Sequence, residues 1–313
     1  MKSVVTGVAG FIGSHLAEKL LAAGHEVVGI DNFLDNYPRP FKEKNLSPLP
    51  IHRNFTFVGD DLLQCNLKSM LRGASYIFHL AGQPGVRSSW GKEFVRYTDN
   101  NIRSTQLLLE AAKELRLAKF VYASTSSVYG DTVDLPMRED GGTRPISPYG
   151  ATKLAAEHLC HLYWKAFGVP TVSLRFFTVY GPRQRPDMFF HILMRALLNG
   201  DEVPLYDDGE QTRDFTFFAD IVDGTLAAAF YAGQGEVFNL GGGSEISVLN
   251  AIALMEKISG RKAKLKRFDR QKGDVRHTKA RLELAKTKLG YSPKIGLEQG
   301  LIDEWNWFCA THD

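Results

Sequence analysis

Short apolar runs, each the length of one β-strand, alternate with helical stretches through the first half of this chain of 313 residues. The strand-like runs are 3–6, 26–30, 55–58, 76–80, 119–123 and 171–176, and helical patterns begin near Gly10, Gln64, Asn101 and Tyr149. Strands that are apolar throughout and separated by helices are typical of a parallel sheet covered on both faces. The alternation therefore predicts an α/β protein built on a doubly wound parallel sheet.

The pattern changes after about residue 178, where a Pro-, Gly- and Arg-rich stretch at 181–186 is typical of a loop. Helices are predicted at about 188–198 and at 220–231, followed by a strand at 237–240, and the rest, including 248–259 and 296–308, is assigned to a smaller second lobe. We expect 220–231 and 237–240 to return to the first sheet as its last unit. The predicted division is therefore a dinucleotide-binding domain of residues 1–177 plus about 213–240, and a smaller α/β substrate-binding lobe of about 178–212 plus 241–313.

A glycine-rich turn follows the first strand, with glycines at Gly7, Gly10 and Gly13. In such turns the first glycine permits a tight bend, the second lets the backbone approach a pyrophosphate, and the third lets the helix pack on the strand. The helix that begins here directs its free N–H groups and the positive end of its dipole at phosphates. An ordinary strand-to-helix loop is the alternative, because the spacing is three and three instead of the usual two and three. The turn nevertheless indicates a Rossmann domain.

Asp31 ends the second apolar run. A carboxylate there accepts hydrogen bonds from both ribose hydroxyls and repels a 2′-phosphate, which favours NAD over NADP as cofactor. Asp60 or Asp61, after the third run, is predicted to reach the adenine, with a helix N-cap for the segment at Leu62 as the alternative.

Tyr149 and Lys153 lie four positions apart in a predicted helix, so their side chains share a face. A free phenol has a pKa near about 10 and is a weak base at neutral pH. A nearby ammonium and a cationic nicotinamide ring favour the phenolate and lower that pKa, which makes Tyr149 a usable general base. Lys153 is also expected to bind the nicotinamide ribose. A solvated Tyr and Lys on a helix surface is the alternative.

A hydroxyl-rich run, Ser124-Thr125-Ser126-Ser127, follows the fifth strand. The carboxyl ends of strands in such sheets face the ligand crevice. A hydroxyl from this run is therefore predicted to hydrogen-bond the reacting alcohol oxygen beside Tyr149, whereas any single one of these residues also fits an ordinary turn.

These motifs together resemble one known family, and the resemblance covers essentially the whole chain. The shared elements are the glycine turn, Asp31, the run 79–82, the run 125–130, Tyr149 with Lys153, and the run 175–183. They are similar to the extended short-chain dehydrogenase/reductases, and more closely to the nucleotide-sugar epimerases and dehydratases. The resemblance implies that Thr125, Tyr149 and Lys153 are catalytic. It also assigns cofactor contacts to Phe11, Ile12, Asn32, Leu62, Leu80 and Ala81.

The resemblance implies a first step in which the sugar C4 is oxidised by NAD while Tyr149 takes the O4 proton. Related dehydratases carry Asp-Glu directly after the catalytic Thr, and related decarboxylases carry Glu at the position of Ser127, whereas this chain has Ser126 and Ser127. What remains is rotation of the 4-keto sugar and reduction of its other face, which is 4-epimerisation. The alternatives are a UDP-glucose/UDP-galactose 4-epimerase and a non-catalytic NAD-binding regulatory protein.

The stretch from Arg175 to Met188 resembles UDP-glucuronate 4-epimerases, which implies conversion of UDP-glucuronate to UDP-galacturonate. A uronate needs donors for its carboxylate, and an arginine suits it through its bidentate fork. The candidate sugar-binding residues are Arg87, Ser126, Ser127, Thr178 and Arg185. The family positions for the nucleotide diphosphate and ribose fall on Arg213, Asp274 and Arg276, with surface salt bridges as the alternative.

Composition excludes several other classes. The net charge is only +3, and Lys262, Lys264, Lys266 and Arg267 alternate with apolar residues as one exposed strand face, so no nucleic-acid-binding stripe is expected. The three cysteines match no metal or disulfide spacing, which favours reduced thiols in the cytoplasm and no metal. No apolar run is long enough to cross a membrane.

The stretches 101–115 and 149–167 carry wide apolar surfaces, which include Leu107, Leu108, Leu159, Leu162 and Tyr163. Related enzymes pair these helices into a four-helix bundle, so a homodimer is expected.

Overall fold

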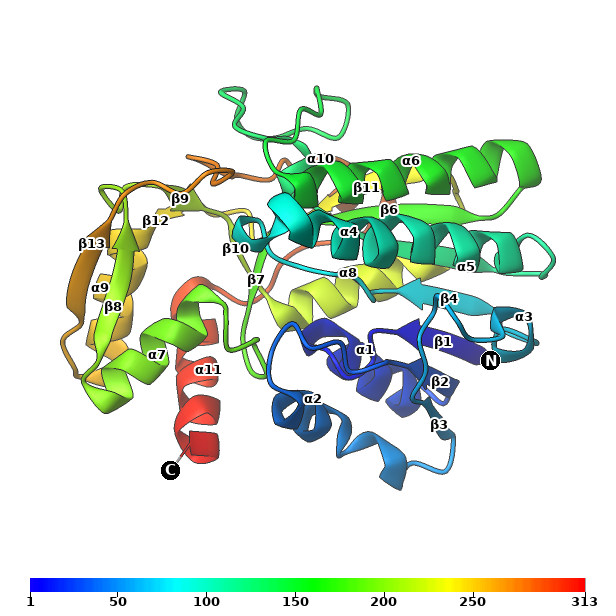
Figure 1. Cartoon of the computed structure of the whole chain (residues 1–313), viewed down its shortest axis with the longest axis horizontal. Coiled ribbons are helices and arrows are strands. Elements are labelled where there is room, and N and C mark those ends of the chain that lie inside the picture. Colours follow the sequence, from blue (N-terminus) through cyan, green and yellow to red (C-terminus); the bar gives the residue numbers. More distant parts are fainter. Residues whose placement is uncertain (313) are drawn as a thin grey trace.

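The computed structural model describes residues 1–312 and is built around a seven-stranded sheet (Figure 1). All strands of this sheet are parallel, and their order is β11-β6-β5-β4-β1-β2-β3. They span Lys2–Thr6 (β1), Glu26–Ile30 (β2), Phe55–Val58 (β3), Tyr76–His79 (β4), Lys119–Thr125 (β5), Thr171–Phe176 (β6) and Glu236–Leu240 (β11). The predicted doubly wound α/β fold is confirmed.

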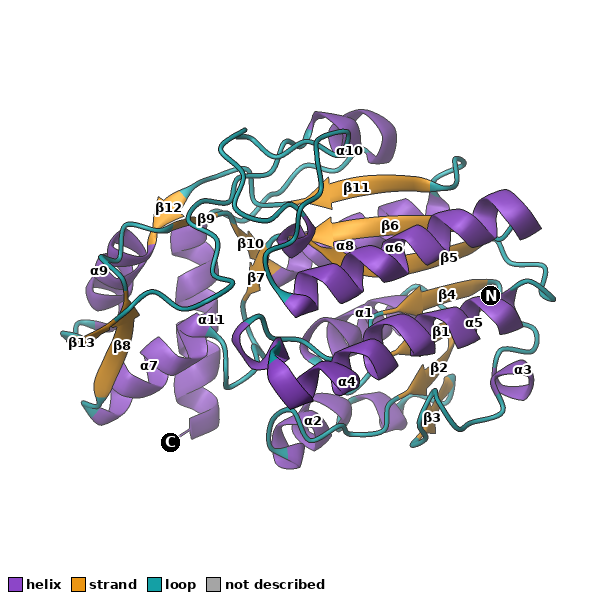
Figure 2. Ribbon diagram, turned by 45° about the horizontal axis from the view of Figure 1, so that its top comes forward, coloured by secondary structure: helices purple, strands orange, loops and turns teal. Residues whose placement is uncertain are grey.

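Helices cover both faces of the sheet, as Figure 2 shows. One face packs against α1 (Phe11–Ala22), α8 (Phe218–Phe230) and α10 (Glu283–Leu289). The other packs against α3 (Leu67–Met70), α5 (Ser104–Ala112) and α6 (Pro148–Phe167). Because both faces are covered, the central strands are buried along nearly their whole length, which is why they read as continuous apolar runs.

The second part of the chain has its own hydrophobic core, formed by residues such as Phe190, Leu205, Met255 and Phe308. Its elements lie to one side of the large sheet (Figure 1). They are β7 (Thr178–Tyr180), α7 (Phe189–Asn199), β8 (Glu202–Tyr206), β9 (Thr212–Arg213), β10 (Phe215–Phe217), β12 (Ile246–Ser247), α9 (Val248–Ser259), β13 (Lys264–Phe268) and α11 (Leu297–His312). The predicted strand with exposed basic residues is β13, whose five residues are all exposed.

Two predicted helices differ from the structure. The segment after Gln64 forms only the four-residue α3, whose N-cap Asn66 accepts a hydrogen bond from Ser69 N–H. The helix predicted from Asn101 begins earlier, with α4 (Phe94–Tyr97), passes through a π-helical turn at Thr98–Arg103 and continues as α5. A further helix, α2 (Arg39–Leu46), follows β2 and was not predicted, because its mean hydropathy is low.

The strand order reverses direction between β1 and β4, which places a crevice at their carboxyl ends. The backbone after β1 and the backbone after β4 approach closely there: a Cβ added to Gly7 would lie 2.8 Å from the Ala81 nitrogen. Across residues 1–312, every helix is too short or too polar to span a bilayer.

Candidate active site

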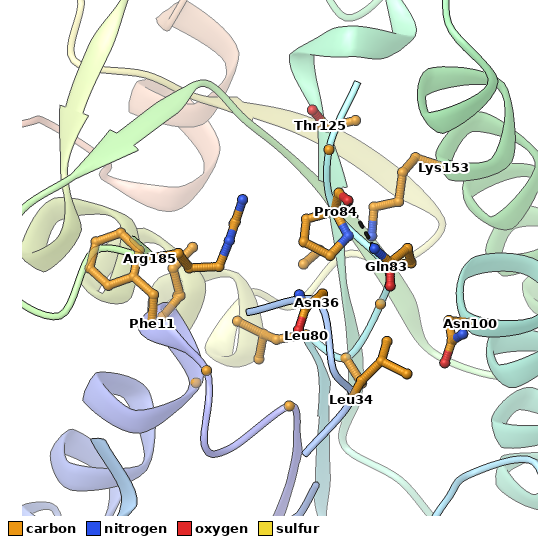
Figure 3. A pocket seen from close by; sticks show the side chains of 18 of the residues that line it. Phe11, Leu34, Asn36, Leu80, Gln83, Pro84, Asn100, Thr125, Lys153 and Arg185 are labelled. Carbon is orange, nitrogen blue, oxygen red and sulfur yellow. Dashed lines mark hydrogen bonds between the residues drawn. The ribbon is translucent and has the colours of Figure 1, made fainter. Parts of the chain in front are cut away.

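A cavity of about 400 Å³ opens at this crevice, a size typical of ligand pockets. It extends from the glycine turn to the end of β5 and the start of α6. Figure 3 shows Thr125 and Lys153 on one side of it and Phe11 and Arg185 on the other. The predicted cofactor residues all line it, together with Thr125, Ser126, Ser127, Thr178 and Arg185.

The glycine turn has the close backbone packing that was predicted from its sequence. Gly7 has a φ of 72°, and its N–H donates to Ile30 O at 2.8 Å. A Cβ on Gly13 would lie only 2.1 Å from Gly7 O, so this position excludes any side chain. No side chain caps α1 at Gly10, which leaves the helix N-terminus facing the cavity. This cradle fits a pyrophosphate.

Asp31 closes the opposite side of the turn. Its Oδ2 accepts from Ala9 N–H at 3.0 Å and its Oδ1 from Phe33 N–H at 2.8 Å. Burial raises the pKa of this carboxyl, and the two backbone donors and the Lys42 charge oppose the shift. A carboxylate held in this way still has free lone pairs for ribose hydroxyls, so the residues present fit a dinucleotide. Asp61 accepts from Leu63 N–H at 2.9 Å and thus closes a turn, whereas the alternative interpretation expected a helix N-cap.

Tyr149 and Lys153 lie in the first turns of α6. Ser147 caps this helix by accepting from Gly150 N–H at 3.1 Å. Gly150 is required there because a Cβ would lie 2.6 Å from Ser127 O. The helix start and the hydroxyl-rich run at the end of β5 are therefore in direct contact, and Thr125 lies within hydrogen-bonding distance of the Tyr149 hydroxyl.

The pKa of Tyr149 is set by burial as well as by nearby charge. Burial raises it, while the hydrogen bond from Thr125 and the charge of Arg185 oppose the rise. The sequence argument invoked the lysine charge and a cationic nicotinamide ring but not the burial, and the lowering it predicts with NAD bound stays a prediction. Burial also lowers the pKa of Lys153 to about 8, and its ammonium lies 4.6 Å from the centre of the Tyr122 ring.

Arg185 lines the cavity from the loop that follows β7. Its Nε and Nη2 donate to the two carboxylate oxygens of Asp187, at 3.0 and 2.9 Å. The loop is anchored by Gln184, whose Nε2 donates to Val179 O at 3.2 Å. The guanidinium is therefore held in a fixed position near Tyr149, within Coulombic range of the phenol.

The other predicted substrate residues form a separate cluster outside the residues that line the cavity. Arg87 pairs with Asp274 at 2.7 Å and lies over the Tyr206 ring at 3.8 Å. Arg276 pairs with Asp208 at 2.6 Å, and Arg213 donates to Arg276 O at 3.3 Å. This cluster adjoins the cavity through Val86, which is next to Arg87 in sequence and contacts the loop at Gly273. Its role in binding a nucleotide stays a prediction.

Sequence reasoning missed Lys42, which lines the cavity, and Asn101, which lies behind its wall and accepts from Gln83 N–H at 2.8 Å. Lys42, from α2, is buried, and its Nζ donates to Asn36 Oδ1 at 2.8 Å and to Leu34 O. Asn101 lies in the π-helical turn, a geometry often found at functional sites, and its Nδ2 donates to Thr152 Oγ1 at 3.0 Å. A lysine in a polar helix and an asparagine in a Thr-Asp-Asn-Asn run carry no signal that separates them from surface residues. Among residues 1–312, no group of His, Cys, Asp and Glu side chains is arranged to hold a metal.

Comparison with known proteins identifies the family to which the chain belongs. The model of the GDP-mannose 4,6-dehydratase family matches residues 4–303. The crystal structure of UDP-glucuronic acid 4-epimerase from Bacillus cereus in complex with UDP-glucuronic acid and NAD has a TM-score of 0.97 and 45% sequence identity, over 100% of both chains. The Bacillus subtilis protein described as "uncharacterized UDP-glucose epimerase YtcB" is 48% identical over 100% of this chain and 99% of its own. UDP-glucuronate 4-epimerase of Thermodesulfobacterium geofontis is 40% identical over 97% of this chain and 95% of its own. The chain thus belongs to the GDP-mannose 4,6-dehydratase family, within the extended short-chain dehydrogenase/reductases.

Proposed function

We propose that this protein is a UDP-glucuronate 4-epimerase that uses bound NAD to convert UDP-glucuronate to UDP-galacturonate. One observation carries the proposal: Tyr149, Thr125 and Arg185 line a single cavity, with the Thr125 hydroxyl in hydrogen-bonding distance of the phenol and the Arg185 guanidinium within Coulombic range of it. A sugar whose O4 meets Tyr149 has its exocyclic carboxylate carbon C6 only two bonds from C4, through C5, within reach of a cation suited to a carboxylate. The Bacillus cereus and Thermodesulfobacterium relatives support the same substrate.

The protein's residues have separable roles in this reaction. Tyr149 takes the proton from O4 during oxidation and returns it during reduction, and Thr125 holds the same oxygen through a hydrogen bond. Lys153 stabilises the phenolate and holds the nicotinamide ribose. Bound NAD supplies the acceptor and donor of the C4 hydride. Between the two half-reactions the 4-keto sugar turns to present its other face.

The 4-keto uronate is a β-keto acid and loses CO₂ readily when its C5–C6 bond stands perpendicular to the carbonyl plane. We propose that Ser126, Ser127, Thr178 and Arg185 hold the carboxylate so that this alignment is poor. All four line the cavity, and Arg185 is itself fixed by Asp187. The absence of a carboxylic acid at position 127 removes the group that would assist decarboxylation.

Turnover with two sugars tests this assignment. The purified protein is incubated with UDP-glucuronate and, separately, with UDP-glucose, without added cofactor, and the products are resolved by NMR. We expect UDP-galacturonate with little pentose from the uronate and slow reaction of the neutral sugar. Faster epimerisation of UDP-glucose, the sugar in the name of the Bacillus subtilis relative, would favour the second candidate function. Binding of NAD with no reaction of either sugar would favour a regulatory NAD-binding protein.

Three further points belong to the proposal. We propose two lobes close to the predicted division, supported by the separate core around Phe190 and Met255, but with β10 in the smaller lobe and α10 on the large sheet. We propose a homodimer through α5 and α6, supported by Leu162 and Phe167 of α6, which are 53% and 54% exposed. The mass of the protein in solution, measured by light scattering, tests this. The cytoplasmic location rests on cysteine number alone.

A further inference from the structure

A buried ion pair joins the strands below the active site to the helix that carries Tyr149 and Lys153. Arg175, in β6, donates from Nε to Glu157 Oε2 at 3.1 Å and from Nη2 to Glu157 Oε1 at 2.5 Å. Ser124, the β5 residue in register with Arg175, donates to the same Oε2 at 2.8 Å. Both charged side chains are only 5% exposed, and neither lines the cavity.

Stability alone is a weak reason for such a pair. Removing two charges from water costs several kcal/mol per ion, and apolar replacements of similar volume are often as stable or more stable. The arginine is nevertheless firmly held: its guanidinium lies 4.7 Å from the centre of the Tyr129 ring, and its Nη1 donates to Glu139 O at 3.3 Å.

The position of Glu157 on α6 suggests what the pair does. Tyr149, Lys153 and Glu157 follow one another at intervals of four residues and so share one face of the helix. Lys153 and Glu157 interact electrostatically. The other groups that face the ammonium are the Tyr122 ring, Cys160 and His79. Glu157 is the one carboxylate among them.

We propose that Arg175 is a positioning residue: by holding both oxygens of Glu157, it prevents this carboxylate from drawing the Lys153 ammonium away from Tyr149. The inference rests on the proposed function only in taking Tyr149 and Lys153 as the proton-transferring pair. It explains why the buried arginine of β6 lies directly beside Ser124, the residue that precedes Thr125.

Removal of Arg175 has a defined consequence. In Arg175→Met, Glu157 keeps only the Ser124 hydroxyl, and the nearest cation on its own helix face is Lys153. The ammonium then pairs with Glu157, and the phenolate of Tyr149 loses its support. An opposite charge at about 4–6 Å shifts a titration by about 1–3 units, so the rising limb of the kcat–pH profile should move up by about one unit. At pH 7 the kcat should fall by about tenfold.

The double variant Arg175→Met/Glu157→Gln separates this role from a structural one. It removes the competing charge but keeps an amide oxygen for the Ser124 hydroxyl. We expect the rising limb to return to within about 0.3 units of wild type and kcat to within about threefold. Arg175→Lys, which keeps a cation at Glu157, should be intermediate. A double variant as impaired as Arg175→Met, or an unshifted limb in Arg175→Met, would overturn the proposal.

The readouts also separate this inference from the choice of sugar. Wild-type protein that epimerises UDP-glucose but not UDP-glucuronate would refute the sugar assignment, and the same variants would then be compared with UDP-glucose. If neither sugar reacts, calorimetry with NAD replaces turnover, because Lys153 is the proposed ribose contact. Weaker NAD binding by about threefold or more in Arg175→Met, restored in the double variant, supports the role, and equal affinities in all proteins overturn it.

Discussion

Replacement of Gly13 by alanine tests the cofactor cradle through a single methyl group. The added Cβ would lie 2.1 Å from Gly7 O, 2.9 Å from Gly7 C and 3.1 Å from Val8 Cα. All three atoms belong to the backbone, so the turn itself must move by about 1 Å to reach ordinary contact distance. The movement disturbs the hydrogen bond from Gly10 N–H to Gly7 O, which is 3.0 Å long. We expect a loss of about 1–3 kcal/mol in stability from overpacking.

The same movement misaligns the helix N-terminus with the cofactor pyrophosphate. Loss of one hydrogen bond to a charged group costs about 1.5–3 kcal/mol, which corresponds to NAD binding weakened by roughly tenfold to a hundredfold. Calorimetry with NAD and thermal denaturation measure the two effects. Gly142→Ala is the matched control, since nothing lies within 4 Å of its Cβ position, and it should change stability by less than about 0.5 kcal/mol. Wild-type NAD affinity in Gly13→Ala would refute the assignment of this turn as the pyrophosphate site.

Four other substitutions have defined outcomes. Burial lowers the pKa of Lys153 from 10.5 to about 8, so the buried charged form destabilises the protein below pH 8. Lys153→Met should therefore raise the free energy of unfolding at pH 7 by roughly 2–4 kcal/mol, and this gain should vanish as the pH rises from 8 to 10.5. Turnover should be lost in the same variant. Burial raises the pKa of Glu304 from 4.5 to about 8, so the stability of the wild-type protein falls as the pH rises from 4.5 to 8. The Tm of Glu304→Gln should therefore equal that of wild type at pH 4.5 and exceed it most above pH 8. Ser127→Glu should raise the ratio of pentose to epimer in NMR of the products, as should Thr178→Ala; an unchanged ratio in both would contradict the proposed control of decarboxylation.

The fold and the cofactor end of the site were predictable because their constraints are local in sequence. Gly7, Gly10 and Gly13 lie in one turn, and Asp31 ends the next strand. Tyr149 and Lys153 are one helical turn apart. Each of these patterns has a single geometric consequence that does not depend on distant residues.

The remainder depends on tertiary contacts that the sequence does not encode locally. Arg175 was recognised only as part of a motif, and its partner Glu157 lies on a different element. Arg87 and Arg276 read as cations for a diphosphate, yet in the structure each is paired with carboxylates supplied by distant segments. The burial of Tyr149, which raises its pKa, could not be foreseen because its extent follows only from the packed structure.

The central claim is that Tyr149 transfers the proton of the sugar O4, and Tyr149→Phe tests it most directly. The substitution removes one hydroxyl from a buried ring, and binding of NAD and UDP-glucuronate, measured by calorimetry, should stay within about threefold of wild type. Epimerisation followed by NMR should fall by about 10²–10⁴-fold or more. A Tyr149→Phe protein that forms UDP-galacturonate within about tenfold of the wild-type rate would contradict the account.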